Sequence, residues 1–184
     1  MASAKTSTVI ALLRGINVGG KNKLSMADLR SIAEEAGFGN ASTYVQSGNV
    51  VLPSVPDGQV GRVAATLTAA IAERTGLTIP VITRTADEWR AIIDANPFPE
   101  AAADGTKLHV ILLDGPPSSK LKAFDAGPFA PEESSVGERE VYLSLPDGMG
   151  RSKLAVAMQR ADHAKSGTAR NWRTVLALDE MAKG

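Results

Sequence analysis

The chain of 184 residues has 20 Lys and Arg balanced by 20 Asp and Glu, 43% hydrophobic residues and no cysteine. This composition is that of a globular protein and excludes collagen-like, coiled-coil and wholly disordered chains, and the missing cysteine excludes disulfides, thiolate catalysis and cysteine-bound metal centres. No apolar run approaches the roughly 20 residues that span a bilayer, and residues 1–7 are too short and polar for a signal peptide, so we expect a soluble, cytoplasmic protein.

The first predicted elements are a buried strand and the helix that follows it across a loop. Residues 8–14 are almost all apolar, which is typical of a strand buried on both faces. A loop rich in glycine, asparagine and lysine comes next. Ser25 and Asp28 have the spacing of a capping box, so they predict the start of a helix, and Gly37 is placed to end it.

A hairpin, a second helix and an edge strand complete the first half. Residues 42–46 and 49–53 are rich in strand-forming residues and only two residues separate them, which predicts a hairpin. Asp57 can cap a helix whose apolar residues recur at helical spacing. Residues 79–84 predict a fourth strand, and the proline within it favours the edge of a sheet. The predicted order is βαββαβ.

The second half predicts a similar run of elements. In chain order they are a helix opened by the capping-box pair Thr85 and Glu88 and ending at Asn96, a strand at 107–113, a helix around 118–125, strands at 134–137 and 140–145, a helix that begins at Ser152, and a last helix at 170–182. Two sequence echoes accompany this similarity: IALLRG at 10–15 with VILLDG at 110–115, and SVPDGQVGR at 54–62 with SLPDGMGR at 144–151.

The two echoes occupy the same places in the same order of elements. They predict an α+β protein built by tandem duplication of a ferredoxin-like βαββα(β) unit, with antiparallel sheets and helices packed on one face. The expected first domain, residues 1–96, is a ferredoxin-like subdomain plus a connecting helix. The second, residues 97–184, is a ferredoxin-like subdomain with a C-terminal helix. The low-complexity stretch at 99–106 marks the expected junction.

The first segment suited to chemistry is LLRGINVGGKNKL at 12–24, where a buried strand delivers Arg14 to a glycine-rich loop. Gly19 and Gly20 allow a ligand to approach backbone N–H groups, while Lys21 and the start of the next helix favour an anion. The loop matches neither the Walker pattern nor GxGxxG. It is therefore either a phosphate or carboxylate site or a flexible loop with solvated lysines.

Two later segments place cations beside predicted helix starts. In DGMGRSKL, Arg151 and Lys153 flank the expected N-cap Ser152, which indicates either an anion site or a glycine turn with an ordinary cap. In TARNWRT, Arg170 and Asn171 open the expected last helix. They are either an exposed, ligand-facing pair or neighbours of a tryptophan that packs in the core.

Other polar residues give weaker signals. Gln46 and Asn49 flank the predicted hairpin turn, where they could read amide or base edges, although we favour a role in the turn itself. His109 alternates with apolar residues on a buried strand, which is typical of a core histidine, and His163 follows a helix in a segment expected to be exposed. Two histidines without a paired carboxylate motif predict no metal site, and no cofactor is indicated. The glutamates that bracket the predicted edge strand are interpreted as solubilising charges: Glu132, Glu133, Glu138 and Glu140.

Four motifs follow one another between about residues 8 and 180: ALLRGINVGGKNKLSMADLR, YVQSGNVV, RSKL and TARNWRTV. Through them the chain resembles the family of bacterial proteins catalogued as DUF1697, a domain of unknown function. The resemblance implies a duplicated ferredoxin-like α+β protein, in agreement with the echoes, and it supplies no reaction. The signature polar residues that it implies are Arg14, Asn17, Lys21, Gln46, Asn49, Arg151, Ser152, Lys153, Thr168, Arg170, Asn171 and Thr174.

Five of these signature residues are cations, and if they converge between the two subdomains, only a bound anion would offset their repulsion. We therefore expect a basic inter-subdomain cleft that binds a small phosphorylated or carboxylated ligand, a nucleotide included. The residues expected to bind it are Arg14, Asn17, Lys21, Gln46, Asn49, Arg151, Ser152, Lys153, Arg170 and Asn171.

Three alternatives stay open. Residues 151–184 carry seven basic and three acidic side chains, so the basic stretch 151–173 could bind a nucleic-acid backbone with steep salt dependence. An enzyme of unknown reaction could use the cations to stabilise a developing anion, with Ser152 or Lys153 as the reactive group, although no general base is evident. A pure interaction module would bind a partner through an apolar patch. The sequence predicts neither protein partners nor an oligomeric state.

Overall fold

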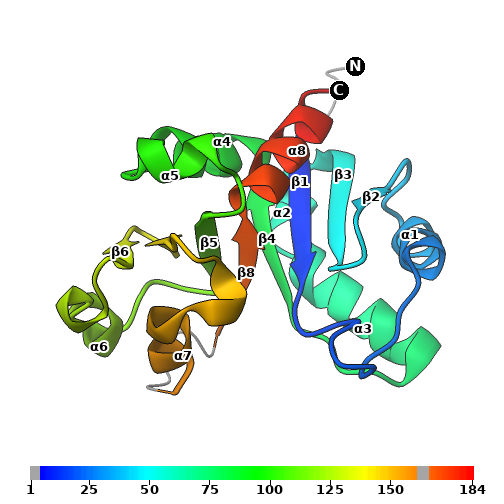
Figure 1. Cartoon of the computed structure of the whole chain (residues 1–184). Helices are drawn as coiled ribbons and strands as arrows, with labels where there is room; N and C mark the ends of the chain where they lie inside the picture. The colour runs from blue at the N-terminus through cyan, green and yellow to red at the C-terminus, as the bar shows by residue number, and fades with distance from the viewer. Residues whose placement is uncertain (1–4, 161–165) are drawn as a thin grey trace. The chain divides into compact units, whose positions relative to one another are not determined.

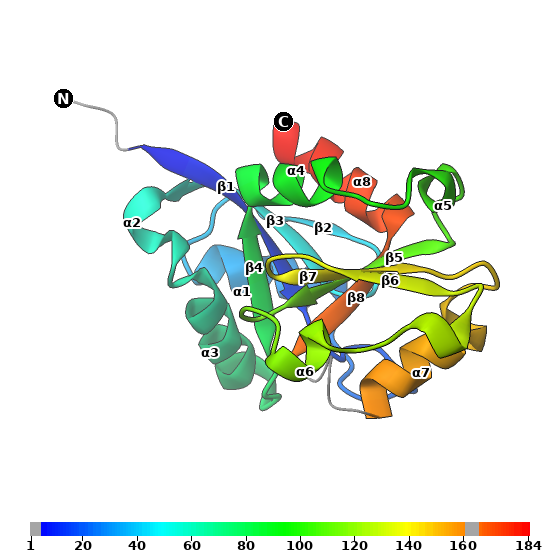
Figure 2. The ribbon, with the colours of Figure 1, turned by 90° about the vertical axis from the view of Figure 1, so that its left-hand side faces the viewer.

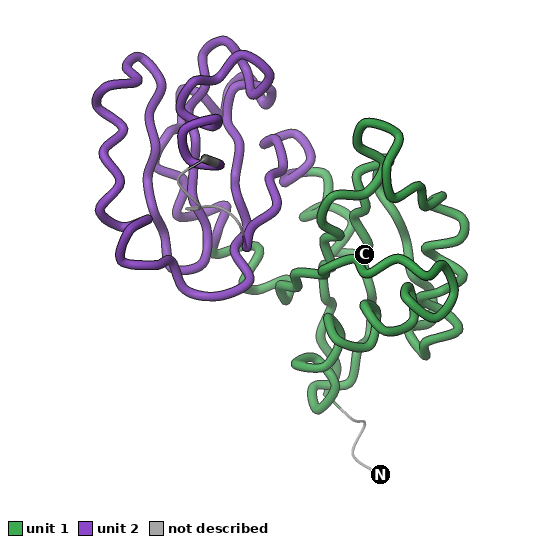
Figure 3. Tube along the Cα trace, turned by 90° about the horizontal axis from the view of Figure 1, so that it is seen from below, with its two compact units in different colours: residues 1–91, 177–184 green, residues 92–176 purple. Residues whose placement is uncertain are grey.

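The computed structural model describes residues 5–160 and 166–184 (Figure 1 and Figure 2). The chain divides into two compact units, residues 1–91 with 177–184 and residues 92–176 (Figure 3). It passes from the first unit to the second within one helix and returns within another. The domain boundary expected between residues 96 and 97 lies five residues after the boundary between the units, which falls between residues 91 and 92. The end of the C-terminal helix, residues 177–184, was expected in the second domain and belongs to the first unit.

The first unit contains a four-stranded antiparallel sheet in the order β2-β3-β1-β4. Its strands are β1 (Thr6–Leu13), β2 (Ser42–Tyr44), β3 (Asn49–Pro56) and β4 (Val81–Thr85). Its helices are α1 (Met26–Glu35), α2 (Asp57–Val60), α3 (Val63–Thr75) and the first part of α4 (Ala86–Asp94). The predicted order βαββαβ is confirmed, except that two helices, α2 and α3, stand where one was expected, and Asp57 is the first residue of α2 rather than its cap. β4 is an edge strand, as the proline before it indicated.

One face of this sheet and two helices, α1 and α3, enclose the core of the first unit. Alternate residues of β1 supply its centre, with Val9 and Leu13 among them. Leu29 of α1, and Leu67 and Ile71 of α3, pack against that centre. Full burial of such aliphatic side chains stabilises a fold by about 2 kcal/mol each. The carboxyl end of β1, where the next loop begins, is therefore held in place by core packing.

Both helix starts that the capping-box spacings predicted are confirmed, and the one at α4 is a complete capping box. The N–H of Asp28 donates to the Ser25 hydroxyl (3.0 Å) at the start of α1, and this hydroxyl donates to the Asp28 carboxylate (2.6 Å). At the start of α4 the bonds are reciprocal: the N–H of Thr85 donates to the Glu88 carboxylate (2.8 Å), and the N–H of Glu88 to the Thr85 hydroxyl (3.2 Å). A residue at positive φ, Gly37, follows the end of α1 as expected.

The second unit repeats this sheet in the order β6-β7-β5-β8, again with antiparallel neighbours. Its strands are β5 (Leu108–Leu113), β6 (Glu133–Val136), β7 (Glu140–Ser144) and β8 (Gly167–Asn171). Its helices are α5 (Pro99–Ala103), α6 (Ser119–Lys122), α7 (Lys153–Arg160) and the first part of α8 (Trp172–Lys183), with 3-10 turns at Gly127–Phe129 and Met149–Arg151. The predicted tandem duplication of a ferredoxin-like α+β unit is confirmed.

The strand β8 was not predicted. The sequence indicated a helix over 170–182, whereas the structure has a strand up to Asn171 and a helix from Trp172. The segment GTARN lacks the apolar alternation that marks a strand, because two of its positions hold glycine and alanine and another holds Arg170. The duplication did carry a signal: Arg170 lies opposite Val110 of β5, as Arg84 of the equivalent strand β4 lies opposite Ile10 of β1.

Within residues 5–160 and 166–184, no helix combines the length and the apolar character that crossing a bilayer would require.

Candidate functional site

Two signature segments of the first unit meet at the end of its sheet where β1 finishes. β1 and β2 run in the same direction, because each is antiparallel to β3, so the loop after β1 and the turn after β2 leave the sheet at one end. The N–H of Leu13 donates to the carbonyl of Gly48 (2.8 Å), and the side-chain amide of Asn17 to the carbonyl of Gln46 (2.8 Å). The residues of the predicted site that share this end are Arg14, Asn17, Lys21, Gln46 and Asn49.

The glycine-rich loop of this end forms a small hairpin of its own. The N–H of Asn17 donates to the carbonyl of Asn22 (3.2 Å), and the N–H of Lys21 to the carbonyl of Val18 (3.1 Å). The two glycines between them have positive φ, as a two-residue hairpin turn requires. The segment is thus closed by hydrogen bonds of its own backbone, and Lys21 is exposed on it.

Two of the predicted ligand-binding residues of this end use their side chains to hold the loops. The Asn17 oxygen accepts from the N–H of Leu24 (3.0 Å), while its amide donates to the carbonyl of Leu24 (2.9 Å) and to that of Gln46. Asn49 is fully buried, and its amide donates to the carbonyl of Tyr44 (2.8 Å) and the hydroxyl of Ser47 (3.0 Å). Their geometry is that of turn-stabilising residues.

The start of α1, expected to favour an anion, is already occupied by a carboxylate. Asp28 accepts the Ser25 hydroxyl there and offsets the partial positive charge of the helix N-terminus. The cations nearby are nevertheless available, since in the described residues neither Arg14 nor Lys21 makes a salt bridge. The Gln46 side chain is exposed as well.

The other five predicted site residues belong to the second unit, at the end of its sheet where β5 begins. β7 ends opposite Leu108 and β8 ends opposite His109, so the loop before α7 and the start of α8 leave the sheet at this end. The N–H of Leu145 donates to the carbonyl of Lys107 (2.8 Å), which ties the loop before α7 to β5. The predicted residues here are Arg151, Ser152, Lys153, Arg170 and Asn171.

Arg170 and Asn171 are not an exposed, ligand-facing pair. The Arg170 side chain lies on β8 and the residue is 6% exposed, with its guanidinium donating to the Thr168 hydroxyl (2.7 Å) and the carbonyl of Ala169 (2.8 Å). Burial lowers the pKa of Arg170 to about 10, which leaves it charged at neutral pH. The Asn171 oxygen accepts from the N–H of Thr174 (2.9 Å) and so caps α8.

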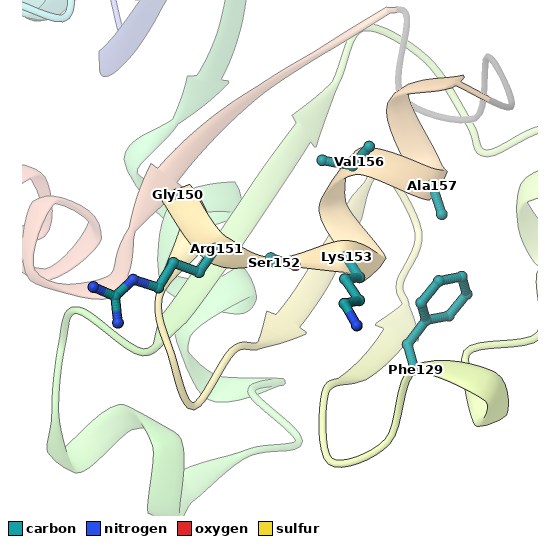
Figure 4. A pocket seen from close by; sticks show the side chains of 7 residues that line it. All are labelled: Phe129, Gly150, Arg151, Ser152, Lys153, Val156 and Ala157. Carbon is teal, nitrogen blue, oxygen red and sulfur yellow. The ribbon is translucent and has the colours of Figure 1, made fainter.

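A surface depression of about 700 Å³ lies beside α7 (Figure 4). Lys153, Val156 and Ala157 line it from one face of the helix, as their spacing of three and four residues dictates. Phe129 lines it from the 3-10 turn that precedes β6. The Lys153 side chain extends from α7 and the Phe129 side chain from the opposite turn into the space between them, whereas the Arg151 side chain extends away (Figure 4).

Two of the first three N–H groups of α7, those of Leu154 and Ala155, have side-chain partners. The N–H of Ala155 donates to the hydroxyl of Ser152 (2.9 Å), which is buried and forms the N-cap that the sequence indicated. The N–H of Leu154 donates to the carboxylate of Glu132 (2.8 Å). Glu132, interpreted from the sequence as a solubilising charge, is thus a capping residue. An anion in the depression would find these two N–H groups already occupied, which leaves the side-chain cations as its main contacts.

Glu140 is a second glutamate that the structure shows not to be a solubilising charge. It is buried, and its carboxylate accepts from the N–H groups of Glu138 (3.3 Å) and Arg139 (3.0 Å) in the turn before β7. Burial, and then this nearby carboxylate, raise the pKa of Tyr142, whose hydroxyl donates to the carbonyl of Ile92 (2.7 Å). These groups hold the turn and the strand.

His109 is a core histidine, as the sequence indicated. It is 9% exposed and shares its face of β5 with Ile111 and Leu113, which belong to the core of the second unit. Burial lowers its pKa, and its Nδ1 has no hydrogen-bond partner. His163 lies outside the described residues. Over the part of the chain that the structure describes, no cluster of three histidine or acidic side chains could hold a metal ion.

Four residues that line the depression are absent from the predicted ligand-binding residues: Phe129, Gly150, Val156 and Ala157. The helical spacing of the last two from Lys153 could have indicated a shared face. Nothing in the sequence around Phe129 distinguishes it from a core aromatic residue, because its position depends on the 3-10 turn.

Comparison with known proteins supports the fold and gives no activity. The model of a family described as "Protein of unknown function (DUF1697)" matches residues 6–142. RSKL and TARNWRTV lie beyond this range. A solved structure, the conserved bacterial protein SP0830 from Streptococcus pneumoniae, is similar with a TM-score of 0.80 at 18% identity, covering 98% of this chain and 100% of that chain. No curated protein matches the chain.

Proposed function

The chain belongs to the DUF1697 family, and we propose that it binds a small phosphorylated or carboxylated ligand, nucleotides included, in the depression beside α7. One observation carries the proposal. Three consecutive residues that the sequence marked as an anion-binding candidate, Arg151 to Lys153, line the same hollow in the surface. A volume of about 700 Å³ is within the range of small-molecule sites.

The charge of the depression favours an anion. Arg151 and Lys153 are exposed, and neither makes a salt bridge within the described residues. The Lys153 side chain extends from the start of α7 toward the turn that holds Phe129 (Figure 4), so its ammonium group can contact a phosphate or carboxylate in the depression. Arg151 is an exposed side chain and can change rotamer within nanoseconds to become a second contact.

The other functions raised by the sequence have less support. For nucleic-acid binding through residues 151–173, Arg170 is not accessible to a phosphate, because it is buried and hydrogen-bonded within the protein. Catalysis through Ser152 would need a hydroxyl that is free, whereas this one is buried and caps α7. The exposed Lys21 of the first unit is the competing cation, and a Lys21→Met variant tests whether the anion binds there instead.

A panel of nucleotides, sugar phosphates, carboxylates and short RNA tests the proposal by thermal shift, with calorimetry for every compound that gives a shift. We expect at least one small anion to bind, and Lys153→Met to weaken it about 10-fold, because an exposed charge-assisted hydrogen bond contributes about 1.5 kcal/mol. Lys120→Met, which removes an exposed lysine on α6, is the matched control and should leave the affinity unchanged.

Three results would contradict the proposal. A panel without any binding small anion would exclude the function. Loss of binding in Lys21→Met with none in Lys153→Met would move the site to the loop after β1. Binding of RNA alone, with an affinity that falls steeply between two salt concentrations, would favour the nucleic-acid alternative.

Glu132→Gln is expected to tighten the binding of the anion about 2- to 5-fold. Glutamine keeps an oxygen that can accept from the N–H of Leu154, while the change removes a negative charge at the first turn of α7. The loss of charge at the helix N-terminus should lower the free energy of unfolding by only about 0.5 kcal/mol. Glu133→Gln removes the exposed neighbouring charge and is the control. An unchanged or weaker affinity in Glu132→Gln would mean that the anion does not lie near this turn.

A further inference from the structure

Phe129 presents a fixed aromatic ring to the depression beside α7. The ring stacks on that of Phe124, with the centroids 6.1 Å apart and the planes within 14° of parallel. This offset arrangement is favourable for aromatic pairs and supports the Phe129 ring from one side. The residue is half-buried and lines the depression together with α7 (Figure 4).

The α7 side of the depression is apolar beyond its lysine. Val156 is 45% exposed and is one of four large hydrophobic residues that the described part of the chain leaves open to solvent. Ala157, beside it on the helix, also lines the depression. Inorganic phosphate or a sugar phosphate would leave these apolar groups in contact with water, so such ligands do not explain the composition of the lining.

We infer that the ligand is an anion that carries a planar aromatic group, as a nucleoside phosphate does, with the aromatic group against Phe129 and the apolar wall of α7, and the anionic group at Lys153. This inference rests on the proposed function and names the class of its ligand. Stacking of a base on an aromatic side chain strengthens binding about 5- to 150-fold. The fixed ring loses little conformational freedom when the ligand binds, which favours the upper part of that range.

Calorimetry on the full chain with AMP, ribose 5-phosphate and adenosine tests the inference. We expect AMP to bind at least 10-fold more tightly than ribose 5-phosphate, and adenosine more weakly than AMP. Phe129→Leu should remove most of the difference between AMP and ribose 5-phosphate and leave the affinity for ribose 5-phosphate unchanged. Val156→Thr keeps the shape of the exposed side chain but replaces one methyl group by a hydroxyl, so it should weaken AMP binding about 2- to 3-fold without affecting folding.

The outcomes separate the inference from the proposal on which it rests. Equal affinities for AMP and ribose 5-phosphate would overturn the inference and leave an anion site in place. Equal affinities for AMP and adenosine would mean that the ring is bound and the anion is not, which overturns the proposed function. Binding of none of the three, or an AMP affinity that survives both Phe129→Leu and Val156→Thr, would overturn the inference. If Phe129→Leu unfolds because the stack on Phe124 is lost, Val156→Thr alone carries the test.

Discussion

Gly48→Ala is expected to lower the free energy of unfolding by about 3 kcal/mol. Gly48 has a φ of +77°, a conformation that costs any residue with a Cβ about 1 kcal/mol or more. An added Cβ would lie 2.6 Å from the Cδ1 of Ile16 and 2.7 Å from the Cβ of Leu13. These contacts are closer than packed carbon atoms allow, and relief requires the backbone to move, since the Cβ of Leu13 has no rotamer to change.

The turn has little freedom to make that movement. The carbonyl of Gly48 accepts from the N–H of Leu13, and the next residue, Asn49, is buried and pairs with Leu12 of β1. Denaturant titration of Gly48→Ala, and of Gly39→Ala as its control, measures the change in the free energy of unfolding. Gly39→Ala is the control, because Gly39 is exposed, has no positive φ and would place its Cβ in open space. If Gly48→Ala differs from Gly39→Ala by less than about 0.5 kcal/mol, the turn is looser than the structure shows.

Most of the fold could be predicted because its signals are local. A capping box needs only two residues three positions apart, so Ser25 with Asp28 and Thr85 with Glu88 marked the starts of α1 and α4 correctly. The duplication then supplied what local patterns cannot, because two units of the same element order imply the same strand order. β8 was not predicted, because GTARN is a strand through its pairing with β5 and shows no apolar alternation.

The candidate site was harder to predict, because a polar residue in a sequence does not reveal what its side chain faces. Asn49 and Arg170 were expected to bind a ligand, and both are buried with their hydrogen bonds made inside the protein. Lys153 was expected on the same grounds and is exposed beside a depression. Phe129, which completes that depression, gave no polar signal at all. Residue types single out segments, but only the structure separates side chains that hold the loops from those that are open to a ligand.

Asn17→Asp makes this distinction measurable for a residue that the sequence placed in the ligand site. We expect the free energy of unfolding to fall by about 3 kcal/mol. The change removes the two bonds that the Asn17 amide donates to the carbonyls of Leu24 and Gln46, and it leaves a carboxylate against these two carbonyl oxygens. Two lost hydrogen bonds account for about 2 kcal/mol, and the unfavourable approach of like charges accounts for the rest. The backbone of Asn17 has a φ of 54°, which aspartate tolerates nearly as well as asparagine.

Asn22→Asp is the matched control, since Asn22 also has a positive φ (47°) but is exposed and donates a single side-chain bond, to the carbonyl of Gly15 (3.0 Å). Its loss should be about 1 kcal/mol. The deficit of Asn17→Asp should shrink as the pH falls, because the surrounding carbonyls raise the pKa of the introduced carboxyl, and its protonation restores one donor. Ligand binding at Lys153 should remain in the folded fraction of Asn17→Asp. A stable variant that no longer binds the anion would instead return Asn17 to the ligand site and overturn its role as the residue that joins the loop after β1 to the turn after β2.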